Sequence, residues 1–277
     1  MIGMTGQTTP FPGDREAVAA RIEDRFVAGR PPGVKLPGER ELAQQIGVSR
    51  PILREALRSL AERGLIEVSP GRGAFTRMPG PADLARPLDS LFRRQQATPR
   101  QLVEARLMLE CQTATLAAER AEPGELRRMR AVLEQLDQSS GPLEKAGFDI
   151  TFHTLLARAA HNPVIEAMFA SITPLTYELM IRSLADPKVS AEGAPLHHDL
   201  LHALERRDQT QARAVMSQHL SLALERYGED LDLSLDQVAR RELNKITGLP
   251  VSVGEFLSTI ERLASAADQV GLAAEES

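Results

Sequence analysis

Four side chains able to bind a metal ion lie in the second half of this 277-residue chain. Asp149 and His153 stand four residues apart in FDITFHTLL, which puts both on one face of a helix. His197 and His219 belong to two later helical segments. One carboxylate and three imidazoles are sufficient to bind a divalent metal with one coordination position open. The spacing alone also fits a hydrogen-bonded Asp–His pair without a metal.

A row of arginines near the N-terminus is the second group of residues whose type and spacing could serve in binding. Arg50, Arg54 and Arg58 follow one another at intervals of four and share one face of a helix expected over 50–63. Long donors at the start of such a helix can reach base edges in the major groove of DNA. The alternative is an ordinary solvated face. The opposite face carries the apolar stripe of Leu53, Ala56, Leu57 and Leu60.

The N-terminal sequence predicts the helices and the hairpin that must position these arginines. A helix is expected from Asp14 to Ala28, a Pro/Gly-rich turn follows, and a short helix spans 39–46. Gly47 suits the left-handed position that closes this helix, and Ser49 can cap the next one. Two β-prone runs, LIEV and AFTRM, flank SPGRG and predict a hairpin. We therefore expect a winged helix-turn-helix over 10–78.

The remainder of the chain has no alternating strand pattern, so the fold class is mainly α with a C-terminal all-helical bundle. A Pro-containing linker is expected at 79–87, an all-helical domain at 88–228, and an acidic extension of unassigned role at 229–277. An α/β domain is the less favoured alternative. The expected helices span 88–95, 99–121, 123–138, 142–160, 163–183, 194–206 and 209–227, with weaker patterns at 234–246 and 253–268.

Charge is distributed unevenly along the chain. Residues 1–79 contain 12 Lys/Arg and 9 Asp/Glu, a net charge of +3, whereas residues 80–277 contain 21 and 29, a net charge of −8. This polarity suits a protein that contacts DNA with one end. We expect no signal peptide and no membrane span, and the single cysteine, Cys111, fits a reducing cytoplasm.

The run LPGERELAQQIGVSRPILREALRSLAERGLIEVSPGRGAF resembles the winged-helix domain of the GntR family of transcription regulators. The resemblance implies a homodimer that binds a double-stranded inverted-repeat operator. Pro51 and Ile52 replace hydroxyl-bearing contact positions of a fatty-acid-responsive member, which changes the expected base preference. The residues implied to contact DNA are Arg40, Ser49, Arg50, Arg54, Gly71 at the tip of the wing, and Arg72 as an addition.

The helical body resembles the FCD effector domain of the FadR subgroup, through EARLMLECQTATLAAERA, FDITFHTLL, HHDLLHALERRD and AVMSQHL. The resemblance implies a divalent metal, zinc first and nickel or manganese as alternatives, with Asp149, His153, His197 and His219 as ligands. His197 is preferred to its neighbour His198 because it sets the following leucines in the subgroup's register. Arg106 is implied to bind a small carboxylate effector, and an ion pair with Glu110 is its alternative role.

These patterns favour a non-enzymatic DNA-binding regulator, expected to be a repressor, whose operator affinity changes when an organic acid binds. The ligand must then bind two arrangements of the DNA-binding heads with different affinity. One alternative is a metal-dependent hydrolase, since the same metal could activate water. Another is an architectural DNA-binding protein without an effector.

Overall fold

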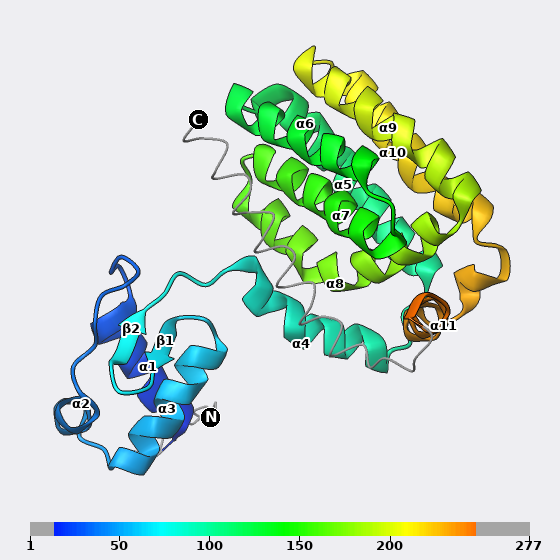
Figure 1. Cartoon of the computed structure of the whole chain (residues 1–277). Coiled ribbons are helices and arrows are strands. Elements are labelled where there is room, and N and C mark those ends of the chain that lie inside the picture. Colours follow the sequence, from blue (N-terminus) through cyan, green and yellow to red (C-terminus); the bar gives the residue numbers. More distant parts are fainter. Residues whose placement is uncertain (1–13, 248–277) are drawn as a thin grey trace, which may run out of the picture. The chain divides into compact units, whose positions relative to one another are not determined.

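The computed structural model describes residues 14–247, except for a few side chains between residues 81 and 86. The chain divides after Asp83 into two compact units, each of which is described by itself. Figure 1 shows the helices and the small sheet that make up the two units.

The N-terminal unit is a winged helix-turn-helix, as expected. Its apolar core joins the three helices to the first strand, with Ile22, Leu53 and Leu60 completely buried. The elements are α1 (Arg15–Ile22), one π-helical turn (Glu23–Val27), α2 (Glu39–Ile46), α3 (Arg50–Glu62), β1 (Ile66–Ser69) and β2 (Gly73–Thr76).

Local sequence explains most of the boundaries in this unit. The Asp14 side chain accepts a hydrogen bond from the backbone N–H of Glu16 and caps α1. Gly47 ends α2 with φ of 78°, a left-handed conformation that favours glycine. Ser49 occupies the N-cap position of α3, but its side chain makes no capping hydrogen bond, contrary to expectation. Its exposed hydroxyl is therefore not used by the helix start.

The wing is the antiparallel pair β1–β2, in which Ile66 pairs with Thr76 and Ser69 pairs with Gly73. Gly71, at the turn, has φ of 72°, so the turn requires a left-handed residue there. An isolated bridge between Lys35 and Phe75 ties the loop before α2 to the second strand. The wing is thus anchored at its base, and its tip projects from the unit.

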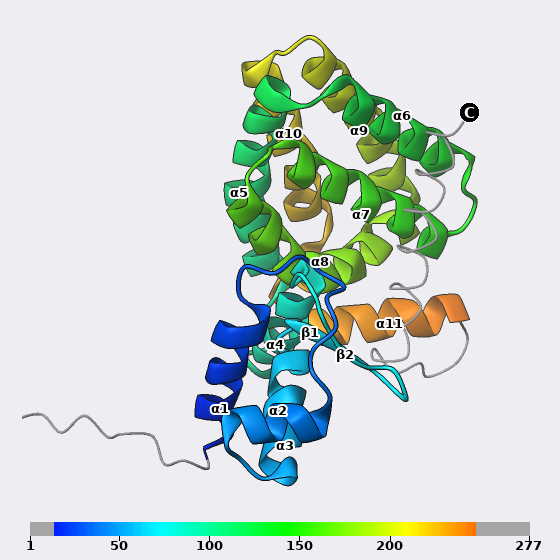
Figure 2. The same ribbon diagram turned by 90° about the vertical axis from the view of Figure 1, so that its left-hand side faces the viewer.

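The C-terminal unit is all-helical over its described residues, as expected. Helix α5 packs most extensively on α10, α7 on α8, and α9 on α10. Figure 2 shows α11 at the end of the bundle near α8, on which it packs. The helices are α4 (Pro81–Arg94), α5 (Pro99–Arg120), α6 (Pro123–Gln138), α7 (Pro142–Ala159), α8 (Pro163–Ala185), α9 (Pro187–Glu205), α10 (Gln209–Arg226) and α11 (Leu235–Thr247).

Proline marks the start of many of these helices. A first-turn residue needs no N–H donor, and proline already has a helical φ there. A polar side chain caps several of the same helices, as Thr98 does in a reciprocal capping box with Gln101 before α5. Helices that begin with proline include α5, α6, α7, α8 and α9.

Two helix starts differ from the sequence expectation. The segment 79–87, expected as a linker, is helical from Pro81, with Pro87 inside α4. Helix α9 begins at Pro187 rather than 194, because Asp186 caps it through the N–H groups of Lys188 and Val189. Pro195, which lies inside α9, removes a hydrogen bond to the carbonyl of Ala191, an exposed residue that water can reach.

Helix α8 is the one described helix long and apolar enough to cross a membrane, with a mean hydropathy of 1.3. It is packed inside the bundle, where it contacts α5, α7, α9 and α11. It also carries the fully buried polar residues Thr176 and Glu178. These contacts are those of a core helix.

The weaker helical pattern expected at 253–268 lies outside the described residues.

Arg93 on α4 links three helices of the C-terminal unit. Its guanidinium donates hydrogen bonds to Asp89 at 2.9 Å, to Glu178 on α8 at 2.5 Å, and to Asp236 on α11 at 3.4 Å. Glu178 is only 1% exposed, and one oxygen each of Glu178 and Asp89 has no hydrogen-bond partner. Burial raises the pKa of Glu178 to about 7, although Arg93 beside it lowers this pKa in part.

Candidate metal centre and nucleic-acid interface

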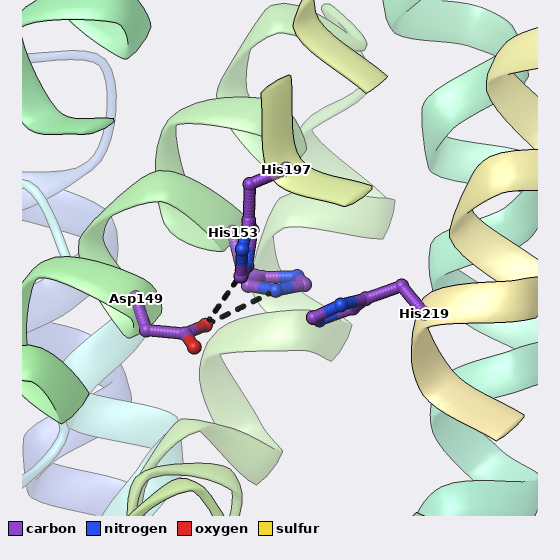
Figure 3. A group of neighbouring side chains, drawn as sticks. All are labelled: Asp149, His153, His197 and His219. Carbon is purple, nitrogen blue, oxygen red and sulfur yellow. Dashed lines mark ion pairs between the residues drawn. The ribbon is translucent and has the colours of Figure 1, made fainter. Parts of the chain in front are cut away.

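The structure brings together the four residues singled out as metal ligands. One ligand atom from each of Asp149, His153, His197 and His219 lies within 4.8 Å of the others. Helix α7 supplies the first two residues, α9 the third and α10 the fourth, as Figure 3 shows. Asp149 Oδ1 lies 3.3 Å from His153 Nε2 and 3.4 Å from His197 Nε2. Three helices far apart in sequence thus meet at one point.

Electrostatics favours a carboxylate together with imidazoles at this point. Burial raises the pKa of Asp149, but the charges of His197 and His153 outweigh burial and hold this pKa well below its usual value. Burial lowers the pKa of His219 far below its usual value, and the charges of His197 and His153 lower it further. A neutral imidazole and an ionised carboxylate are the forms that coordinate metals.

The donor atoms of this cluster are short of partners. Buried polar groups almost always have hydrogen bonds, so several unsatisfied atoms in one place require an explanation. One divalent ion with nitrogen and oxygen ligands would satisfy one atom of each of the four residues. The residues present therefore fit a metal. The buried atoms without a hydrogen-bond partner are Asp149 Oδ1, His153 Nε2, His197 Nδ1, His197 Nε2 and His219 Nδ1.

Glu110 on α5 fixes the orientation of His153. Its carboxylate accepts a short hydrogen bond from His153 Nδ1 and another from Arg106 Nε, the latter at 2.5 Å. With Nδ1 occupied, Nε2 of His153 faces the other ligands with its lone pair. Burial lowers the pKa of His153, but the negative charge of Glu110 outweighs this and raises it overall. A metal ion therefore competes with a proton for this ring.

A cavity of about 530 Å³ lies against the cluster. Arg106, Asp149, His197 and His219 line it, together with apolar side chains of α8 and α10. Arg106 is 5% exposed and pairs with Glu110, while its Nη2 has no partner. The ion pair and the position on the cavity wall, expected as alternatives, therefore occur together.

The remaining histidines of this unit lie outside the cluster. His198 Nε2 lies 3.0 Å from Asp137 Oδ2, and His161 Nε2 lies 2.9 Å from Glu125 Oε2. His202 is exposed on α9. Of the two adjacent candidates on α9, the structure thus puts His197, and not His198, beside the other candidate ligands.

The N-terminal unit exposes every residue that the sequence assigned to DNA. Arg50 and Arg54 project from the first turns of α3, and both lie next to Glu39 on α2. Arg54 Nε donates to Glu39 Oε2 at 2.9 Å, and Arg50 Nη2 lies 3.5 Å from the same oxygen. One carboxylate therefore positions two arginines at the N-terminus of the candidate recognition helix.

The other candidate DNA contacts are also accessible. Arg40 is exposed on α2, and Ser49 is exposed immediately before α3. Gly71 is exposed at the tip of the wing. Arg72, next to it, packs its guanidinium over the ring of Phe75, 5.8 Å from the ring centroid. This contact directs a cation along the wing.

Comparison with known proteins identifies the family. A model of the gntR family of bacterial regulatory proteins matches residues 14–76, and a model of the FCD domain matches residues 101–222. The Escherichia coli K12 protein named "Putative L-lactate dehydrogenase operon regulatory protein" is 32% identical over 226 residues, which cover 78% of this chain and 86% of that protein. The chain belongs to the GntR family.

Further relatives agree with this assignment. The GntR regulator is 31% identical to LutR of Bacillus subtilis, over 69% of this chain and 90% of LutR. Its fold is similar to that of a GntR protein of Streptococcus agalactiae, with a TM-score of 0.61, 25% identity, and coverage of 76% of this chain and 99% of that chain. The chain is thus a DNA-binding transcription regulator with an FCD effector domain and not an enzyme, so the hydrolase alternative is dropped.

Sequence reasoning missed two acidic residues of these sites. Glu39 lies 15 residues before Arg54, and Glu110 lies 43 residues before His153. The interval of four from Arg106 to Glu110 gave a signal for an ion pair. No local pattern links either acid to its more distant partner, since each contact depends on the packing of two helices.

Proposed function

We propose that this chain acts as a homodimer that binds an inverted-repeat operator and represses transcription until a small organic acid binds at a metal ion in its FCD domain. The observation that carries the proposal is the group of four donor residues beside a cavity that also reaches Arg106. The relatives are bacterial transcription regulators, so we expect this chain to act in the cytoplasm, where its DNA is.

The DNA half of the proposal assigns base contacts to Arg50 and Arg54 and further contacts to Arg40, Ser49, Gly71 and Arg72. All six are exposed on one compact unit. An arginine that makes two hydrogen bonds to guanine contributes about 1–3 kcal/mol of discrimination. A single winged helix neutralises few phosphates, and two copies in a dimer double those contacts.

Operator binding by full-length protein tests this assignment. In a gel-shift or fluorescence-anisotropy titration, Arg54→Ala should weaken operator binding about tenfold or more, which corresponds to the loss of one bidentate contact. Arg15→Ala is the matched control, because Arg15 is exposed on α1 and pairs only with its neighbour Glu16 among the described residues. Equal affinities of the wild type and Arg54→Ala for the operator would contradict the assignment.

The metal half assigns Asp149, His153, His197 and His219 as ligands, with zinc first and nickel or manganese as alternatives. Mixed nitrogen and oxygen ligands suit all three metals. When bound, the ion supplies positive charge that attracts the carboxylate of an effector. Arg106, whose Nη2 is unsatisfied on the cavity wall, would hold the same carboxylate from its other side.

Metal analysis of purified protein tests the ligand set. The wild type should bind about one divalent ion per chain in a competition titration, and His219→Ala should lose most of this affinity. His202→Ala, on the exposed surface of α9, is the matched control and should bind the ion as the wild type does. Unchanged metal affinity in His219→Ala would refute the assignment.

Effector binding is tested by thermal shift with small carboxylates, with and without metal. The name of the Escherichia coli relative refers to an L-lactate dehydrogenase operon, so 2-hydroxy acids belong in the panel. A true effector should stabilise the metal-loaded protein and change its operator affinity. Operator binding that no carboxylate alters would instead favour an architectural DNA-binding protein.

A further inference from the structure

Lys145 places a second cation at the cavity. It lies on α7, four residues before Asp149 and eight before His153, so the three residues share one face of the helix. Lys145 is partly buried and lines the same cavity as Arg106 and His219. Four residues of α-helix correspond to about 6 Å along its axis. The lysine therefore lies one helical turn beyond the candidate metal site.

The Lys145 ammonium makes no ion pair or hydrogen bond with another residue in the part of the chain that the structure describes. Asp149, one turn further along the same helix face, lies 3.3 Å from His153 Nε2 and 3.4 Å from His197 Nε2 through its Oδ1. Asp137, the other acid that lines the cavity, is half exposed and pairs with His198. A cation on a partly enclosed wall is thus left available for a ligand.

The balance of charge around the cavity also favours a negatively charged ligand. Arg106 and Lys145 carry two positive charges, and the buried acids Asp149 and Glu110 carry two negative charges. A divalent ion at the cluster adds two positive charges. Charge repulsion in a partly enclosed site is weakly screened, so a ligand with two negative charges fits better than a ligand with one. Asp137 changes this balance little because it is solvated and paired.

We infer that the effector is a small dianion, of the dicarboxylate class, with one acid group at the metal and Arg106 and the second group bound by Lys145. This inference rests on the proposed metal-dependent effector site. The cavity of about 530 Å³ is of the size that holds a small ligand, and its lining includes the apolar side chains Leu179, Met180 and Leu220. A short carbon chain between two carboxylates matches that arrangement.

Calorimetric titration of full-length, zinc-loaded protein with ligands of matched length tests the inference. Succinate should bind about tenfold or more tightly than butyrate, and L-malate more tightly than L-lactate, because each dicarboxylate gains one charge-assisted contact. Lys145→Gln should remove that preference and leave the affinity for butyrate and lactate unchanged. Lys145→Arg should retain it, and so should the control Lys188→Gln, which changes an exposed lysine on α9.

Several results would overturn the inference. Equal affinity for succinate and butyrate in the wild type would refute the dianion while leaving a metal-dependent effector site intact. Equal loss of both affinities in Lys145→Gln would mean that the lysine supports the metal cluster and does not distinguish ligands. Failure of every carboxylate to bind the zinc-loaded wild type would overturn the proposed effector site as well. The melting temperature of each variant, measured in parallel, separates these results from loss of folding.

Discussion

Replacement of Glu178 by glutamine should stabilise the C-terminal unit at neutral and alkaline pH, and much less in acid. Glu178 lies on α8 with its carboxylate 1% exposed and 2.5 Å from Arg93, and Asp89 and Asp236 contact the same guanidinium. Burial raises the pKa of Glu178 from 4.5 to about 7. The single cation cannot compensate for burial of an acid that two other acids also face.

The sign of the effect follows from proton binding. Between pH 4.5 and 7 the folded protein keeps the Glu178 proton that the unfolded chain has lost, so the free energy of unfolding falls as the pH rises. Above the folded pKa of about 7 the loss is complete. A difference of about 2.5 pKa units corresponds to a ceiling of about 3 kcal/mol, of which about 2 kcal/mol develops between pH 5 and 8. Glutamine keeps an oxygen for Arg93 and carries no charge.

Thermal unfolding of the wild type and Glu178→Gln at pH 5 and pH 8 measures this difference. The melting temperature of the variant relative to the wild type should rise by about 4–8 °C more at pH 8 than at pH 5. Glu134→Gln, at an exposed position on α6, controls for the general loss of one carboxylate. A difference between variant and wild type that is the same at both pH values would refute the reasoning, because the titration of Glu178 would then not contribute.

Three further predictions concern other contacts. Glu110→Gln, which weakens the acceptor for His153 Nδ1, should lower metal affinity about 10- to 100-fold in a competition titration, and unchanged affinity would show that this contact does not support the site. Leu60→Ala removes a completely buried side chain of α3 and should cost about 2–5 kcal/mol in the denaturant-induced unfolding of the N-terminal unit, whereas a cost below 1 kcal/mol would contradict the packing. Gly47→Ala puts a residue with a Cβ at a position where φ is 78°. The free energy of unfolding should fall by about 1 kcal/mol in the same assay. No change would mean that the end of α2 rearranges and does not need a left-handed residue.

Local signals were sufficient for most of the fold. The helices expected from 99 and from 163 do begin there, at the prolines that start α5 and α8, because a first-turn residue needs no N–H donor. The starts expected at 88 and 194 were wrong, because Pro87 and Pro195 lie inside the longer helices α4 and α9. Whether a helix tolerates an internal proline depends on packing and on solvent access to the carbonyl that loses its hydrogen bond. Neither property can be predicted from the neighbouring residues alone.

The candidate metal site was also predictable only in part from local sequence. The interval of four from Asp149 to His153 placed two donors on one face, but their meeting with His197 and His219 depends on how α7, α9 and α10 pack. The family resemblance, rather than any spacing, supplied that long-range information. It did not extend to Glu110, whose buried carboxylate contacts both Arg106 and His153.

The shared carboxylate of Glu39 has a consequence for how the N-terminal unit meets any anion. Arg50 and Arg54 already have a negatively charged neighbour inside their own domain, so a phosphate or a guanine edge must compete with it. An anion that binds these arginines then replaces the Glu39 carboxylate and does not simply add a contact. Weak, poorly aligned anions gain little from such an exchange, whereas a ligand with two well-placed acceptors displaces the carboxylate. In the proposed DNA complex, Glu39 would therefore disfavour loose attachment of these arginines to DNA.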